Sequence, residues 1–163
     1  MQAKGEFALL KQDLTVAQEK PGQPVKRGTM AHDHHLYMIL TDTAAQHRDE
    51  EDLRCYTPRL EELAVRDDHQ LYQGIAHRAW GIAHHLAHEY DKAADRLNQA
   101  MGIFRRLDTR WQIGRTLLEL GRVDIDRRDK DSARDHFSQA LEAFEAIKAV
   151  GDMERTKAAL DSL

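Results

Sequence analysis

An internal repeat with a period of 40 residues constrains the fold of this chain more than any other feature. The offset is constant, since Gly121 follows Gly81 by 121 − 81 = 40 residues, and the two copies align without a gap. Self-similarity at such a period indicates an array of equal units that bury their apolar faces against one another. The matching positions are Gly74 and Gly114, Gly81 and Gly121, Asp91 and Asp131, Ala93 and Ala133, Asp95 and Asp135, Gln99 and Gln139, Ala100 and Ala140, and Phe104 and Phe144.

The apolar spacing within each copy predicts two helices. In the second copy, Ile113, Leu117, Leu120 and Val123 recur near a 3.6-residue period, followed by the spaced small and aromatic residues of a second helix. Short connections at 88–90 and 128–130 predict that the two helices run antiparallel, and breaks are expected at 107–109 and 150–152. We expect Asp91 and Asp131 to cap the second helices.

Glycines inside these helices predict close packing. Gly81 and Gly121 fall within the first helix of each copy, where glycine costs about 1 kcal/mol relative to alanine. We therefore expect each to mark a point where a neighbouring helix leaves no room for a Cβ.

These residues resemble the tetratricopeptide repeat. Trp80-Gly81 and Leu120-Gly121 are similar to its Leu-Gly pair, Tyr90 to its turn aromatic, Ala93, Ala133, Ala100 and Ala140 to its small positions, and Phe137 with Leu97 to its second-helix aromatic. The sequence departs from the motif at His77, Leu117, His84 and Asp124. The 40-residue period exceeds the usual ~34 and resembles the long variety in the C-terminal helical repeats of bacterial ATPase-coupled transcriptional regulators.

The resemblance implies an all-α, antiparallel helix-pair solenoid of about seven helices. We expect an N-terminal helix and linker over 1–32, with Phe7, Leu10, Leu14 and Ala17 on one face of a helix at 6–19. A repeat domain over 33–163 would follow, with units at about 33–66, 74–110 and 114–148 and a capping helix at 152–163. Pro58 predicts a kinked or broken helix in the first unit, or a shorter helix that begins after Thr57.

Charge and cysteine content narrow the function. A net charge of −4 gives no global attraction to nucleic acid or to anionic membranes, and the chain has no apolar run of signal-peptide or membrane-spanning length. The lone Cys55 favours a reducing compartment, so we expect a cytoplasmic protein. There is no nucleotide-binding motif, so neither cofactor nor catalysis is expected.

The family's groove positions, counted from the aligned glycine, predict a concave face that mixes apolar and cationic groups. Such a face suits a protein or peptide that is amphipathic and carries acidic groups. The chain would then be a non-catalytic scaffold or a regulatory sensor. The positions are His35, Met38, Asp42 and Gln46; Ile75, Arg78, Ile82, His85 and Leu86; and Arg115, Leu118, Arg122, Ile125 and Asp126.

Two other functions stay open. His77, His84 and His88 lie on one helix with spacing that permits a metal-dependent enzyme, although His77 and His84 occupy motif positions that large packing residues usually fill. We therefore favour packing roles for them. Alternatively, exposed ends of the array would stack two copies into a homodimer.

Overall fold

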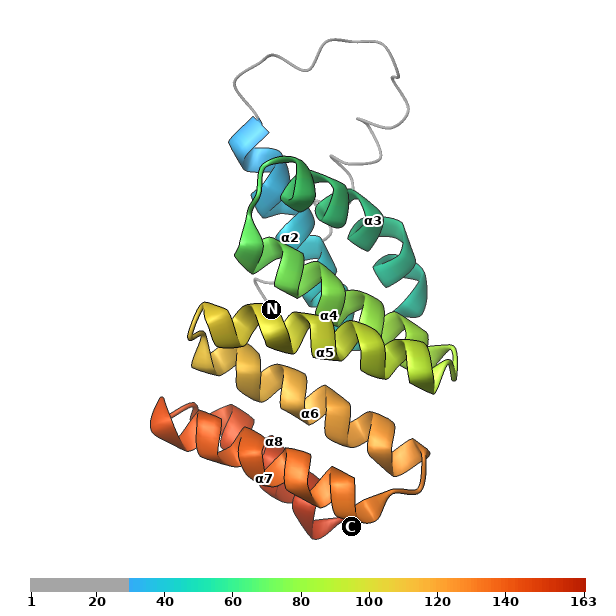
Figure 1. Cartoon of the computed structure of the whole chain (residues 1–163), viewed down its shortest axis with the longest axis vertical. Coiled ribbons are helices and arrows are strands. Elements are labelled where there is room, and N and C mark those ends of the chain that lie inside the picture. Colours follow the sequence, from blue (N-terminus) through green and yellow to red (C-terminus); the bar gives the residue numbers. More distant parts are fainter. Residues whose placement is uncertain (1–29) are drawn as a thin grey trace, which may run out of the picture.

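Seven helices in antiparallel pairs make up the described part of the chain. The computed structural model describes residues 30–163, with side chains from His34 onward, so the helix predicted at 6–19 and the boundary at 32 lie outside it. Successive pairs stack along the long axis of the molecule (Figure 1), which confirms an all-α helical-repeat solenoid. The helices are α2 (Met30–His47), α3 (Glu50–Arg66), α4 (Gln70–Leu86), α5 (Tyr90–Arg106), α6 (Arg110–Asp126), α7 (Lys130–Ala146) and α8 (Val150–Asp161).

The six inter-helix turns within residues 30–163 share one backbone geometry. One residue in each turn has a positive φ, and the residue after it donates its N–H to a carbonyl five positions earlier, as in Glu89 N to His84 O at 2.9 Å. These positive-φ residues recur every 20 positions, because α3 to α7 each have 17 residues. They are Arg48, Asp68, His88, Asp108, Arg128 and Lys148.

This regularity corrects two expectations. The break predicted at 150–152 is wrong: the turn is centred on Lys148, and Gly151 lies inside α8. The N-cap residues of the second helices are Glu89 and Asp129 rather than Asp91 and Asp131. The Asp129 carboxylate accepts a hydrogen bond from Ser132 N at 3.0 Å, whereas the Glu89 side chain does not cap its helix. In both cases the helices begin two residues earlier than expected.

Pro58 does not break its helix. α3 runs without interruption from Glu50 to Arg66 with Pro58 inside it, so the broken helix and the helix starting after Thr57 are both wrong. Proline removes one backbone hydrogen bond and costs about 3 kcal/mol in a helix interior. The buried side chains of α3 offset that cost, because Leu53, Leu60 and Leu63 are 0 to 1% exposed.

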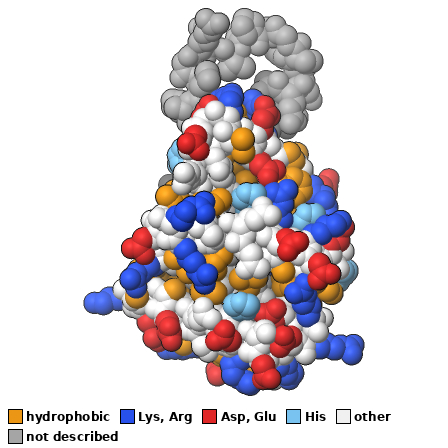
Figure 2. All heavy atoms as spheres, viewed as in Figure 1, with side chains coloured by type: hydrophobic (Ala, Val, Ile, Leu, Met, Phe, Trp, Pro, Cys, Tyr) orange, Lys and Arg blue, Asp and Glu red, His pale blue; other side chains and the backbone are white. Residues whose placement is uncertain are grey.

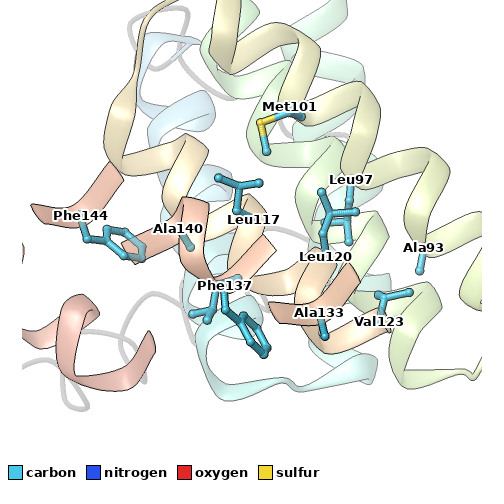
Figure 3. Packing of buried hydrophobic residues seen from close by; sticks show 11 residues of the cluster. Ala93, Leu97, Met101, Leu117, Leu120, Val123, Ala133, Phe137, Ala140 and Phe144 are labelled. Atoms are coloured by element: carbon cyan, nitrogen blue, oxygen red, sulfur yellow. The ribbon is translucent and has the colours of Figure 1, made fainter. Parts of the chain in front are cut away.

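The two glycines inside α4 and α6 pack as predicted. A Cβ on Gly81 would lie 2.6 Å from Leu97 Cγ, and one on Gly121 would lie 2.6 Å from Phe137 Cδ1. Both distances are shorter than real Cβ contacts, so no side chain fits there. Figure 3 shows Leu97 and Phe137 within the buried cluster that joins α5, α6 and α7.

The first unit reaches the same packing with different residue sizes. Gly74 faces Phe104 and Gly114 faces Phe144, so the small residue comes from the first helix. One period earlier the equivalent positions hold His34 and Ala64, which reverses the sizes. His34 Nε2 lies 3.0 Å from Leu63 O on α3, so its ring reaches across the pair.

A similar change occurs at the second contact. The equivalents of Gly81 and Leu97 are Thr41 and Thr57, both fully buried, so two medium residues replace a small and a large one. Total volume is conserved, as a close-packed core requires.

The C-terminal end of the array is covered by α8. Met153, Leu160 and Leu163 pack against the cluster that contains Phe137 and Phe144. The other side of α8 is polar and exposed, with Glu154, Lys157 and Asp161 in solvent. Within residues 30–163, no helix has both the length and the apolar character needed to cross a membrane.

Candidate ligand-binding face

The first helices of the units line the inner side of the array. α2 packs against α4, and α4 against α6. Within residues 30–163 the second helices are packed less closely, and α3 and α5 meet through the ion pair of Glu61 with Arg96 at 2.8 Å. The array therefore curves with the first helices inside. A pocket of about 100 Å³ opens on this side; its walls are Ala45 and Gln46 of α2, Arg78 and Ile82 of α4, Trp111, Arg115, Leu118, Glu119 and Arg122 of α6, and Asp152 and Arg155 of α8.

Asp42 joins three successive first helices by pairing with two arginines of the pocket wall. Its carboxylate accepts hydrogen bonds from Arg78 Nη2 at 3.0 Å and from Arg115 Nη1 at 2.8 Å. Burial alone would raise the pKa of Asp42, but Arg78 and Arg115 hold that pKa below its ordinary value. Burial, and then Arg115, lowers the pKa of Arg78 to about 9, so its guanidinium is charged at neutral pH. Arg78 also donates to Gln112 Oε1 on α6.

A second ionic cluster lies beside the first. Arg48, in the turn after α2, donates to Glu119 Oε2 at 2.7 Å and to His85 Nδ1 at 3.0 Å. Arginine has no acceptor, so Nδ1 of His85 must accept and Nε2 carries the proton. His85 Nε2 then donates to Asp126 Oδ2 at 2.7 Å. Arg122 donates to the second oxygen of Glu119. Arg48 of the first unit and Glu119 of the third, 71 positions apart, are thus directly linked.

The structure brings most of the predicted face together but changes the role of Arg78. Asp42, Arg78, His85, Arg115 and Arg122 all belong to the two ionic clusters. The side chain of Arg78 is 2% exposed and is neutralised by Asp42, so it supports the pocket from beneath. We expected it to grip a ligand directly, and this burial argues against that.

The apolar members of the predicted face divide into three groups. Ile82 and Leu118 line the pocket. Ile75, Met38 and Leu86 belong to or pack against core clusters, and Ile125 is 37% exposed away from the pocket walls.

The pocket also contains residues that the sequence did not identify. Trp111 is 42% exposed, donates its indole N–H to Asp152 Oδ2 at 2.9 Å, and lies under the Arg115 guanidinium at 4.6 Å. Arg155 follows Arg115 by one period, so the repeat itself could have identified it. Arg48 left no such signal, because it lies in a turn where groove positions are not counted.

The three histidines of the metal hypothesis have separate surroundings. His77 Nδ1 accepts from Arg96 at 2.9 Å, and burial together with Arg96 lowers the pKa of His77. His84 stacks on Trp80 and lies 2.6 Å from Glu89 Oε2.

The last of the three is at the surface. His88 is exposed and contacts the Tyr90 hydroxyl at 3.0 Å. Among the side chains that the structure describes, no three His, Cys, Asp or Glu residues are grouped to hold a metal ion.

Comparison with protein-family models identifies the family of this chain. The tetratricopeptide-repeat model matches residues 64–146, which is half of the chain and includes α4 to α7. The chain belongs to the tetratricopeptide-repeat family. Tetratricopeptide repeats generally mediate protein–protein interaction and scaffolding, and the family is typically non-catalytic. No curated protein matches the chain in sequence. The resemblance to the repeats of ATPase-coupled regulators stays a prediction.

The face of the molecule seen in Figure 2 has no large patch of one charge. Figure 2 shows Lys and Arg interspersed with Asp and Glu over the face seen in Figure 1. An excess of cationic residues is instead found locally, within the pocket.

Proposed function

We propose that this chain is a protein-binding scaffold module whose inner face holds an amphipathic segment that carries acidic groups. The observation that carries the proposal is local charge: the pocket walls include four arginines and two acidic residues, in a chain whose net charge is −4. Asp42 pairs with two of these arginines, and with it included the cations still outnumber the acids by four to three. A cationic surface on a chain with a negative net charge favours ligands that carry negative charge at that surface.

Two arginines are suited to contact such a ligand directly. The side chains of Arg122 and Arg155 are 37% and 64% exposed, and each has a carboxylate partner three residues before it on its own helix. A ligand carboxylate placed between them would accept charge-assisted hydrogen bonds from both. Trp111, Leu118 and Ile82 provide the adjoining apolar surface for an apolar ligand side chain.

A peptide-display screen tests the proposal. Full-length protein is used to select binders from a random peptide library, and the selection is repeated with Arg122→Glu/Arg155→Glu. We expect the parent to enrich peptides with Asp or Glu beside apolar residues, and the double variant to lose them by at least tenfold. Selection of uncharged or basic peptides by the parent would contradict the proposal.

A matched control separates the face from general charge effects. The side chains of Arg59 and Arg134 are 41% and 58% exposed, lie on second helices, and each pairs with an acid three positions away on the same helix. Arg59→Glu/Arg134→Glu changes the net charge equally and should leave selection intact. Equal losses in the two double variants would place the binding surface elsewhere.

The biological role of a scaffold depends on the protein or domain to which it is joined. We propose that this module recognises a partner either by itself or as the sensor part of a larger regulator, and that it acts in the cytoplasm.

A further inference from the structure

One edge of the array, where each unit joins the next, carries most of the exposed large apolar side chains. The helices alternate in direction, so the α5–α6 and α7–α8 turns lie on the same edge (Figure 1). Among the residues whose burial is described, six large apolar side chains are exposed, and Ile125 alone of these lies near the other end of a helix pair. Exposed apolar side chains are normally scattered singly over a protein surface, so this grouping indicates a contact surface. The other five are Val65, Leu107, Trp111, Ile147 and Val150.

A groove of about 450 Å³ lies at this inter-unit edge. Leu71 of α4, Trp111 of α6 and Ile147, which follows α7, form its apolar walls, and we call it the edge groove. Ile147 is 40% exposed, so the apolar wall is open to solvent. The charged residues of the walls are Asp108 and Arg110, one of each sign. A cavity of this size with mostly apolar walls and no net charge suits a large apolar side chain.

Trp111 is shared by the edge groove and by the cationic pocket of the inner face. Its indole N–H donates to Asp152 Oδ2 at 2.9 Å, and the Arg115 guanidinium carbon lies 4.6 Å from the ring centroid. These two contacts hold the ring in place. The pocket and the edge groove are therefore neighbours on either side of one fixed ring, and a single ligand that crosses the ring reaches both.

We propose that the partner segment in the pocket continues across Trp111 and places a large apolar side chain in the edge groove. This inference rests on the proposed function, because the pocket holds the acidic group of the same segment. It adds a requirement on the partner: an acidic residue must stand within about three residues of a large aliphatic or aromatic one, since an extended chain advances about 3.3 Å per residue.

The helix ends at this edge favour an acidic segment. Leu71 and Trp111 are the second residues of α4 and α6, and neither helix has an acidic residue in its first turn or a side-chain cap. By contrast, α3, α5 and α7, which begin at the opposite edge, each have an acidic residue in the first turn. Asp152 in the first turn of α8 already accepts hydrogen bonds from Trp111 and Arg155. The positive ends of the α4 and α6 dipoles therefore add to the attraction for negative charge.

Selection from a random peptide library tests the inference with the full-length chain. The parent should enrich peptides in which Asp or Glu stands within about three residues of a large apolar residue. In Ile147→Asn the preference for the large apolar residue should fall at least threefold, because an apolar wall of the groove becomes polar, while the preference for the acid is kept. Val65→Asn is the matched control, since Val65 is exposed at the same edge but does not line the groove.

The outcomes separate this inference from the proposed function. If Arg122→Glu/Arg155→Glu loses the acidic preference while Ile147→Asn keeps the apolar preference of the parent, the inference is overturned and the proposed function stands. Equal losses in Ile147→Asn and Val65→Asn also overturn the inference, because the groove then has no specific role. A parent that selects apolar peptides without acidic residues overturns both.

Fluorescence of Trp111 gives an independent result. Trp80→Phe leaves Trp111 as the only tryptophan of the chain, and the probe is the peptide most enriched by the parent. Binding of this peptide should reduce acrylamide quenching of Trp111 at least twofold, and replacing its large apolar residue with Ser should remove most of that protection. Unchanged quenching in the complex overturns the inference.

Solution mass detects a different occupant of the edge groove. The parent and both asparagine variants are measured without peptide, and equal masses are expected. A parent dimer that becomes a monomer in Ile147→Asn but not in Val65→Asn would show that a second copy of the chain fills the groove, which overturns the inference.

Discussion

Asp42 and Arg78 should contribute very unequally to the free energy of unfolding, although they form one ion pair. Asp42→Asn removes the charge nearest to the Arg78 guanidinium, whose side chain is 2% exposed. A buried charge that loses its partner costs about 3 kcal/mol or more. At an m-value of about 2 kcal/mol/M, the urea midpoint should fall by about 1.5 M.

Arg78→Met should cost far less. It removes the buried charge itself and keeps an unbranched side chain of similar length, and Asp42 still accepts hydrogen bonds from Arg115 at 2.8 Å and Gln46 at 2.9 Å. We expect a loss of about 1 kcal/mol or less, because the desolvated charge is removed together with Arg78 and the remaining Asp42 carboxylate keeps a cationic partner in Arg115.

The double variant decides between this reasoning and a simple sum of contacts. Asp42→Asn/Arg78→Met should be more stable than Asp42→Asn alone, since the second change removes the unpaired charge that the first one creates. Urea unfolding followed by circular dichroism measures all three, with Asp131→Asn as an exposed control expected within about 0.5 kcal/mol of the parent. Additive losses, or an Arg78→Met loss as large as that of Asp42→Asn, would refute the argument.

Three further predictions rest on single positions. Gly121→Ala should lower the free energy of unfolding by about 1–3 kcal/mol, because its Cβ would overlap Phe137, whereas Gly151→Ala, with no atom within 4 Å, should raise it by up to about 1 kcal/mol; equal effects in thermal unfolding would contradict the packing account. Thr57→Val should raise it by about 1 kcal/mol, since the buried Thr57 hydroxyl has no hydrogen-bond partner among the described residues; destabilisation would mean that the hydroxyl is paired. The folded-state pKa of Asp42 lies below its ordinary 3.8, so its contribution is present at neutral pH and is lost as pH falls below about 3.8; stability of Asp42→Asn should then depend less on pH below 4, and parallel acid titrations of variant and parent would count against it.

The fold could be predicted best where equivalent positions of different units hold the same residue. Units two and three share glycines and aromatics at a constant offset, so helix pairing and the close contacts at Gly81 and Gly121 followed from the sequence. The first unit keeps the same contacts with exchanged sizes, at His34 with Ala64 and Thr41 with Thr57, and a search for identical residues passes over such exchanges.

The binding face was less predictable for a different reason. Counting from the glycines placed Asp42, Arg115 and Arg122 on the inner side, because position on a helix fixes direction. The same count cannot show that Asp42 on α2 neutralises Arg78 on α4, since that depends on how closely the two helices approach. Nor does it reach Arg48, whose partners lie 37 and 71 positions away.

The sequence by itself determined the class of architecture: periodic apolar and small residues specify paired helices, short connections between them, and a stack with an inner side. Only the tertiary structure decided which charged side chains are buried in ion pairs and which are exposed to solvent. Arg78 and Arg122 look alike in the sequence, yet one is buried against Asp42 and the other lies at the edge of the pocket. The physical reason is that burial and pairing depend on distances between helices, which the contacts among all the units set together.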